Sequence, residues 1–422
     1  MVKSVARWLL AIAGLLGGVV AGHVLWQPMP PGHIGIGGGV QAMLTSNGAG
    51  VACVAVVAVL VTVGLTRRRS VASATGVAAA GALLLALPDV VRYPSEASVM
   101  LYSNAVAAGL LLGATSLLVS RTHTGQAALA TGMLAAFLLS GNAVELRRFG
   151  ANEGWTAYAP FRTWEPTAVV PLWVAVVTAA VILAAGVIER RASWSGRVDS
   201  QVLLGAIALP VTGFVANWIL IESDARPVWW CGYVGLMVAL VVWVAWRLPG
   251  SDGAVVFAGA AVLAAVVGGV PSWGTDWWFL AIPAVLLVGG IAVGLRWPRP
   301  PLGFALLAVT AAAALLNPDS WAEIALVASV FVLPTASGYV LASCLPTSAP
   351  ASTIGFSLPF TIGIPGVAAA AWTVRPSHAD FASALEWQVS VTVSAVVVAV
   401  GVIVVCGVGA WGLALRSGPG VR

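Results

Sequence analysis

The chain of 422 residues alternates between long apolar stretches and short polar connections. About 20 apolar residues in an α-helix are enough to cross the hydrocarbon core of a membrane. Charged residues, Pro or Gly bound fourteen such stretches, at 8–26, 48–66, 71–91, 99–119, 125–144, 167–188, 200–221, 228–246, 253–271, 277–295, 302–317, 321–345, 350–372 and 386–415. The pattern therefore predicts an all-α polytopic membrane protein with about 14 transmembrane helices.

Two of these stretches leave a smaller number of crossings open. The stretch at 302–317 is short, and the one at 350–372 is interrupted by Pro359 and Pro365. Non-helical backbone is tolerated at membrane depth only where other protein segments or a water-filled cavity satisfy its polar groups. Either stretch could therefore be re-entrant, and 12 crossings is the alternative.

The composition supports a membrane location. Of all residues 60% are hydrophobic and 8% are charged, whereas a soluble domain carries about 25% charged residues. Most of the exterior must then face lipid. Because the connections are short, we expect no soluble catalytic domain, and any chemistry or transport takes place within the helical bundle or on its loops.

The basic residues predict the orientation. With the N-terminus in the cytoplasm and 14 crossings, 14 of the 20 Lys and Arg residues fall on the cytoplasmic side. Cytoplasmic loops retain Lys and Arg, so we expect both termini to be cytoplasmic in a multi-pass protein of the plasma (inner) membrane. The net charge of +5 then reflects topology, and no nucleic-acid partner is predicted.

One segment of the chain is repeated. Residues 63–89 align without a gap with residues 293–319, and nine of the 27 positions are identical. An offset of eight predicted helices results when two six-helix bundles are separated by two additional helices, as in transporters built from parallel repeats. The identities that carry most weight are Gly64 with Gly294, Arg69 with Arg299, Pro88 with Pro318 and Asp89 with Asp319.

The repeat includes a short basic hairpin between the second and third predicted helices. It reads G-L-T-R-R-R-S at 64–70, with Gly64, Arg67, Arg68 and Arg69, and its echo at 294–300 contains Arg299. In layout and hairpin the chain resembles the 14-helix branch of the major facilitator superfamily. The resemblance implies a bundle at 1–195, two additional helices at 196–250 and a second bundle at 251–422.

The resemblance also implies a central cavity lined by the first, fourth, ninth and twelfth helices. A few hydroxyl and amide groups in an apolar chamber would suit a lipid-like or amphipathic cargo, although hydrogen bonding between helices explains such groups equally. The candidate cavity residues are Tyr102, Ser103 and Asn104 on the fourth helix, Thr335, Ser337 and Tyr339 on the twelfth, and Asn142 and Asn217 elsewhere.

Charged and aromatic groups at the predicted exterior face are further candidates. Asp89 and Asp319, an apparent symmetric pair, could take up protons at the outer mouth, or they could serve as interface anchors. The predicted exterior loop between the fifth and sixth helices, residues 145–166, is rich in such groups. Its Arg147, Arg148 and Arg162 could hold a phosphate or carboxylate, and its Trp155 and Trp164 could stack on a sugar or pack on acyl chains. An interfacial aromatic belt is the alternative for the aromatic residues.

The sequence leaves three classes of function open. The first is a transporter that works by alternating access on an apolar, amphipathic or lipid-like cargo. The second is a non-transporting subunit of a cell-envelope complex with a protein partner, favoured because no Asp or Glu that could couple transport to ions falls near the middle of a predicted span. The third is a polyprenyl-phosphate glycosyltransferase. Such an enzyme is expected to hold a catalytic acid in its first large exterior loop, and the corresponding residues 27–47 contain no Asp or Glu, which disfavours this class. We therefore expect a non-enzyme without a cofactor or metal site, whose partners are membrane lipids and the cargo.

Overall fold

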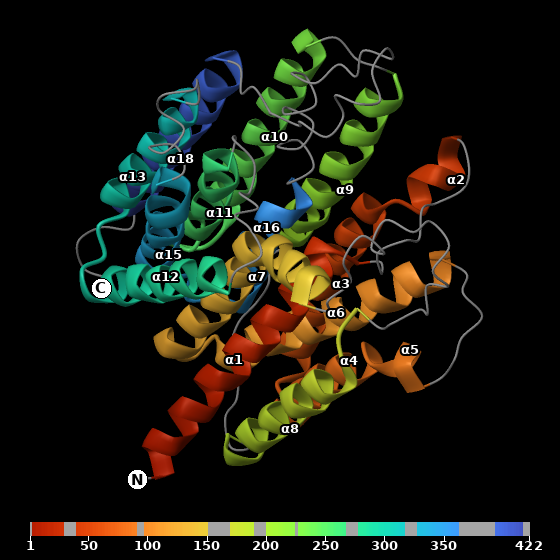
Figure 1. Ribbon diagram of the computed structural model, residues 1–422. Helices are drawn as coiled ribbons and strands as arrows, with labels where there is room; N and C mark the ends of the chain where they lie inside the picture. Colours follow the sequence, from red (N-terminus) through yellow and green to blue (C-terminus); the bar gives the residue numbers. More distant parts are fainter. Residues whose placement is uncertain are drawn as a thin grey trace.

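The computed structural model describes residues 2–28, 39–90, 97–150, 169–189, 200–223, 227–266, 277–316, 327–362 and 393–416. Within these ranges nearly every residue is helical, which confirms the predicted all-α class (Figure 1). Each of the fourteen apolar stretches contains a described helix. The helices are α1 (Val2–Trp26), α2 (Gly39–Leu44), α3 (Asn47–Arg68), α4 (Val71–Leu84), α5 (Leu87–Val90), α6 (Ala97–Val119), α7 (His123–Gly150), α8 (Leu172–Ile188), α9 (Ser200–Glu222), α10 (Pro227–Arg247), α11 (Ala254–Ala265), α12 (Trp278–Arg296), α13 (Pro300–Ala313), the π-helical η3 (Ala328–Val332), α15 (Leu333–Ser343), α16 (Ala349–Thr361) and α18 (Val393–Arg416).

The described helices differ in length. In the described ranges, eight helices are long and apolar enough to cross a membrane. At a rise of about 1.5 Å per residue, the 13 residues of α16 reach only about 20 Å, less than the roughly 30 Å of a hydrocarbon core. Pro359 lies inside this helix, which continues to Thr361, and Pro365 lies outside the described residues.

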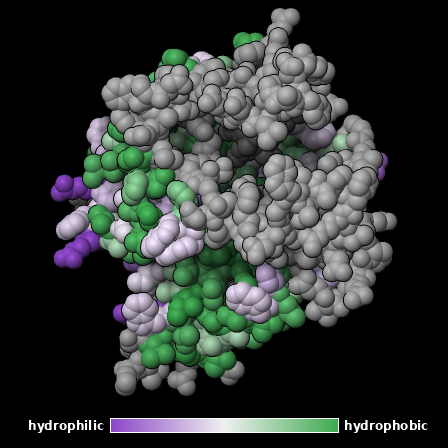
Figure 2. All heavy atoms as spheres, in the orientation of Figure 1, coloured by the Kyte–Doolittle hydropathy of each residue, from purple (hydrophilic) through white to green (hydrophobic). Residues whose placement is uncertain are grey.

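Large apolar side chains cover much of the described exterior. Trp173, Val285 and Val228 are each about 70% exposed, and Figure 2 shows apolar residues in green over the described part of the face in view. A soluble protein rarely exposes contiguous apolar patches of this extent. This surface therefore fits contact with lipid acyl chains.

The helices of the first half, residues 2–189, pack in the same pairs as those of the second half, residues 251–416. In the first half α1 packs on α7, α6 and α8, α3 packs on α6, and α4 packs on α6 and α8. In the second half α11 packs on α16, α15 and α18, α12 packs on α15, and α13 packs on α15 and α18. Each of these pairs is related to its counterpart by the offset of eight predicted helices.

Glycine allows the closest of these contacts. Gly14, Gly18 and Gly22 recur every four residues on the face of α1 that packs on α7. A Cβ atom at Gly18 would lie 2.6 Å from the carbonyl oxygen of Leu129, and one at Gly132 would press into the carbonyl oxygen of Leu15. Small residues at this spacing let transmembrane helices approach backbone to backbone, so the α1–α7 pair depends on the absence of side chains.

The basic hairpin between α3 and α4 forms a tight turn. Arg69 adopts a left-handed conformation with φ 53°, and its N–H donates to the carbonyl oxygen of Leu65 at 3.1 Å. The hydroxyl of Ser70 then caps α4 by accepting a hydrogen bond from the N–H of Ser73 at 3.3 Å. Left-handed backbone costs a non-glycine residue about 1 kcal/mol, so Arg69 occupies a position that glycine would fill with less strain.

The corresponding loop of the second half is built differently. Arg299 precedes α13 with φ −126°, and two prolines follow it in the first turn. A Cβ atom at Gly64 would meet nothing within 4 Å, whereas one at Gly294 would lie 2.6 Å from the carbonyl oxygen of Tyr339. The matched glycines therefore have different packing roles.

The helices α9 and α10, which lie between the two halves in the chain, pack against both halves. α9 packs on α3 and α16, and α10 packs on α9, α11 and α18. The Tyr233 hydroxyl of α10 donates to the carbonyl oxygen of Gly213 in α9 at 3.2 Å, and Arg247 at the end of α10 donates to the Gln201 side chain near the start of α9. The pair thus lies between α3 of the first half and α11 and α18 of the second.

Candidate functional site

The helix α16 lies at the centre of the described bundle. Every residue from Ala349 to Thr361 is buried, and the helix packs on α1, α3, α6 and α7 of the first half, on α9, and on α11 of its own half (Figure 1). Its sequence contains no Asp, Glu, Lys, Arg or His. A short, uncharged helix rich in small residues can be surrounded by protein without burying a charge.

Two threonine hydroxyls meet where α16 contacts the first half. Thr62 of α3 and Thr353 of α16 are fully buried, and their Oγ1 atoms are 3.2 Å apart. The Thr62 hydroxyl also lies 2.7 Å from the carbonyl oxygen of Ala58 and 3.1 Å from that of Gly113, and the Thr353 hydroxyl lies 3.0 Å from that of Ala349. One hydroxyl can therefore donate to the other while the second donates to backbone, so both protons are satisfied.

An aromatic pair forms a second contact between the halves. The rings of Phe137 in α7 and Phe360 in α16 have centroids 5.3 Å apart and an interplanar angle of 77°. This edge-to-face arrangement is a favoured geometry for aromatic rings. α7 also packs on α12 and α15 of the second half. The halves therefore meet through side chains along α3, α7 and α16.

A buried carboxylate fixes the start of α16. Asp252 precedes α11 and is 2% exposed. Its Oδ1 atom accepts hydrogen bonds from the N–H of Thr347 at 2.7 Å and from the Thr347 hydroxyl at 2.9 Å. Because Thr347 lies just before α16, the carboxylate connects the first turns of α11 and α16.

Replacing Asp252 with alanine should destabilise the second half. A hydrogen bond to a charged group contributes about 1.5–3 kcal/mol, and Asp252→Ala removes two while leaving the Thr347 N–H without its acceptor. Asp252→Asn keeps an oxygen acceptor and should cost less. Thermal unfolding of the purified variants checks this order, which equal losses from both substitutions would contradict.

The predicted cavity residues of the fourth helix have backbone partners. The Tyr102 hydroxyl donates to the carbonyl oxygen of Leu44 at 2.8 Å, and the Ser103 hydroxyl donates to that of Met100 at 3.0 Å. The buried Asn104 amide donates to the carbonyl oxygen of Pro28 at 3.1 Å. Two of these three bonds hold α6 to the segments beside α1 and α3.

The predicted residues of the twelfth helix lie on α15. The Thr335 hydroxyl donates to the carbonyl oxygen of Phe331 at 2.7 Å, and the Tyr339 hydroxyl donates to that of Trp297 at 2.8 Å. Ser337 is fully buried, and Asn142 on α7 and Asn217 on α9 are at most 3% exposed.

The structure does not bring Asn104 and Tyr339 together. The partner of Asn104, Pro28, lies beside the first turn of α3, close to Gly50. The partner of Tyr339, Trp297, directly follows the last residue of α12. This position in the second half corresponds to the basic hairpin of the first half, which follows the other end of α3. These two candidate residues are therefore placed near opposite ends of the bundle.

Several other predicted residues lie outside the described residues or at their edge. Asp89 falls in α5, and Arg147 and Arg148 fall in the last turns of α7, but their side chains are not among those described. Arg67 and Arg68 form the exposed last turn of α3. The candidates outside the described residues are Trp155, Arg162, Trp164 and Asp319.

Reasoning from the sequence did not identify the residues that join the halves. Thr62, Thr353, Phe137 and Phe360 sit in apolar stretches that contain many similar residues, and helical spacing alone does not show which face meets which neighbour. The recurring glycines of α1 did carry a readable signal, because a four-residue spacing of small residues marks a helix-packing face.

Comparisons with known proteins place the fold. No protein-family model and no curated protein matches the chain. Among solved structures, the chain is similar to the major facilitator superfamily transporter FucP in the outward conformation, with 14% identity, 98% of this chain and 99% of FucP covered, and a TM-score of 0.50.

Two further solved structures match over nearly their whole lengths. The proton:xylose symporter XylE has 10% identity, 97% and 95% coverage and a TM-score of 0.48. A bacterial homologue of the lysosomal transporter Spinster has 14% identity, 99% and 97% coverage and a TM-score of 0.46. Together with the packing of the helices, the FucP match shows that this chain has the fold of the major facilitator superfamily transporters. The eight described helices that are long and apolar enough to cross a membrane fit a multi-pass membrane protein.

Proposed function

We propose that the protein is a transporter, and not an enzyme, that works by alternating access in the plasma membrane. Residues 1–195 and 251–422 would form the two moving bundles, with the additional helices at 196–250 between them. The observation that carries this proposal is the equivalent packing of the helices in the two halves. Folds of this kind move substrates by rocking one repeat against the other around a site between them.

The contacts within and between the halves differ in a way that supports such motion. Within a half, Gly18 and Gly132 let backbones touch, and such contacts resist sliding. Between the halves, the Thr62–Thr353 and Phe137–Phe360 contacts join side chains, and no buried ion pair has to be broken there among the described residues. Each half can thus move as a unit while the α3–α16 contact opens and closes.

The chemistry of the interface favours an apolar, amphipathic or lipid-like cargo. Residues 47–66 of α3 and 349–361 of α16 contain no Asp, Glu, Lys, Arg or His. A site that offers only hydroxyl groups and hydrocarbon gives an ionised cargo little to replace its hydration, whereas an apolar body gains by leaving water. Asn104 and Tyr339, whose hydrogen bonds lie near the two ends of the bundle, would then stabilise the packing of neighbouring segments and would not bind the cargo.

Reconstitution into liposomes tests the proposal. A fluorescent phospholipid and an amphipathic cationic dye are each offered with and without a proton gradient. The wild type should move at least one of them faster than empty liposomes. Thr353→Phe, which adds bulk between α16 and α3, should abolish the movement, and Val397→Phe, at a position 63% exposed on α18, should preserve it.

The opposite result would favour another class of function. Movement no faster than in empty liposomes for every cargo, together with co-purification of a fixed protein partner, would support the envelope-complex subunit. Movement that Thr353→Phe leaves unchanged would place the route away from the α3–α16 contact.

A further inference from the structure

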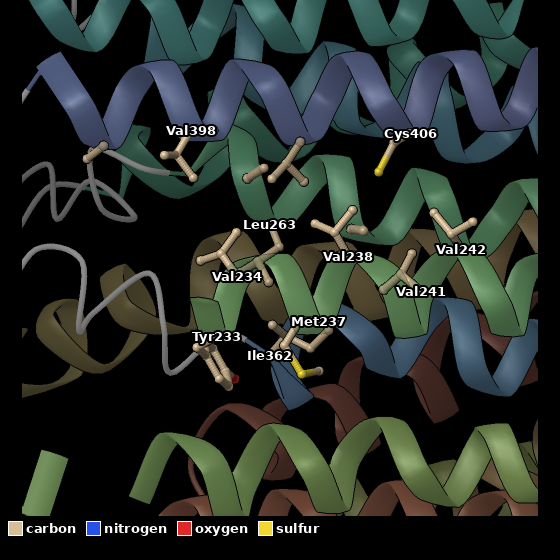
Figure 3. Close-up of a pocket in the computed structure, with 15 residues that line it drawn as sticks. Tyr233, Val234, Met237, Val238, Val241, Val242, Leu263, Ile362, Val398 and Cys406 are labelled. Atoms are coloured by element: carbon tan, nitrogen blue, oxygen red, sulfur yellow. The ribbon is translucent and has the colours of Figure 1, made fainter. Parts of the chain in front are cut away.

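A groove separates the additional helix α10 from the second half. α10 forms one side, α11 and α18 form the other, and Figure 3 shows their side chains pointing into the space between them. The cavity has a volume of about 120 Å³ and is partly open. Tyr233 and Val242 mark its two ends on α10, and Leu263, Val402 and Cys406 line the facing wall.

The lining of this groove is almost entirely hydrocarbon. Apart from Tyr233 and Cys406, it consists of Val, Ala, Leu, Ile and Met side chains. The Tyr233 hydroxyl is already bonded to the carbonyl oxygen of Gly213, and a thiol is only a weak hydrogen-bond donor. A bound water needs about 2–4 polar partners, so the lining of the groove offers no place for a polar ligand or a chain of water.

The groove is continuous with surface that faces lipid. Val238 and Val402 at its edge are half-buried. On the outer faces of the same two helices, Leu236 is 46% exposed, and Val397 and Val404 are more than half exposed. Both helices are long and apolar enough to span the membrane. A hydrocarbon chain from the surrounding bilayer can therefore enter from the side without crossing a polar boundary.

We propose that this groove binds one acyl chain of a bilayer phospholipid. From Tyr233 to Val242 the groove follows ten residues of α10, whose ends are about 14 Å apart at 1.5 Å per residue, which suits an extended hydrocarbon chain lying along the helix. The bound chain fills the space between α10 and the pair α11 and α18. The site is separate from the α3–α16 contact and does not depend on transport.

Photo-crosslinking tests the site. The full-length protein is reconstituted with a phospholipid that carries a diazirine in one acyl chain, illuminated and digested, and the labelled peptides are mapped. The wild type should be labelled at residues of α10 and α18 that line the groove, in addition to lipid-exposed residues such as Leu236 and Val404. Ala399→Trp, which fills the groove from α18, should lose most of the labelling in the groove. Val397→Trp, two residues away on the exposed face of the same helix, should keep it.

A second filling variant and a second probe distinguish the groove from other sources of labelling. Val238→Trp fills the groove from α10, so loss of labelling in both filling variants, with wild-type helical content and elution volume, supports the site. Equal labelling of the wild type and both filling variants would overturn the proposal. So would labelling of the groove by a diazirine fatty acid but not by the phospholipid, because the occupant would then be a free fatty acid.

Discussion

Gly132→Val is expected to destabilise the first half by about 3 kcal/mol or more, at the upper end of the cost of overpacking. A Cβ atom at Gly132 would press into the carbonyl oxygen of Leu15 and approach the backbone nitrogen of Val19. Backbone atoms cannot move aside as a flexible side chain can, so α1 and α7 would have to separate. Unfolding of the purified protein in detergent, followed by circular dichroism, measures the loss.

Gly76→Val is the matched control. Gly76 also lies in a predicted transmembrane helix, but a Cβ atom there would meet nothing within 4 Å. Valine has a somewhat higher helix propensity than glycine, by a few tenths of a kcal/mol, so stability should be unchanged or slightly raised. Equal destabilisation by the two substitutions would show that α1 and α7 do not pack through their glycines.

Cross-linking Thr62→Cys to Thr353→Cys is expected to stop transport almost completely. The two hydroxyl oxygens are 3.2 Å apart, and the sulfur atoms that would replace them must approach to about 2.05 Å to form a disulfide. The bond would tie α3 to α16 and hold the two halves closed at this point. The four natural cysteines are replaced first, and cargo movement in liposomes is compared before and after oxidation.

The controls separate cross-linking from damage. Each single-cysteine variant should transport equally with and without oxidant, and a reducing agent should restore the double variant. Full transport by protein shown to be cross-linked would mean that α3 and α16 do not separate during the cycle.

The sequence predicted the positions of the helices better than the contacts of their side chains. Each apolar stretch bounded by charged residues, Pro or Gly contains a described helix, because the membrane requires about 20 apolar residues per crossing. The rotation of each helix about its axis depends on all its neighbours. The sequence therefore could not predict that the Tyr102 hydroxyl donates to the carbonyl oxygen of Leu44, 58 residues away, and a cavity role for Tyr102 stays a prediction.

The repeat shows the same limit at the level of single residues. The offset of eight helices reappears in the pairs that pack together, as expected when the unit that is repeated is a whole bundle. The matched Gly64 and Gly294 nevertheless have different surroundings. Arg69 and Arg299 also differ, one adopting a left-handed turn conformation and the other preceding two prolines.

Distances between spin labels on the two halves test the central claim most directly. One pair, at Arg68 and Arg299, reports on the end of the bundle with the basic hairpin, and a second pair, at Val99 and Trp278, reports on the first turns of α6 and α12. All four side chains are exposed. Double electron–electron resonance in liposomes, with and without cargo, should show the first distance increasing while the second decreases. Two distances that both stay unchanged would contradict alternating access between two rigid bundles.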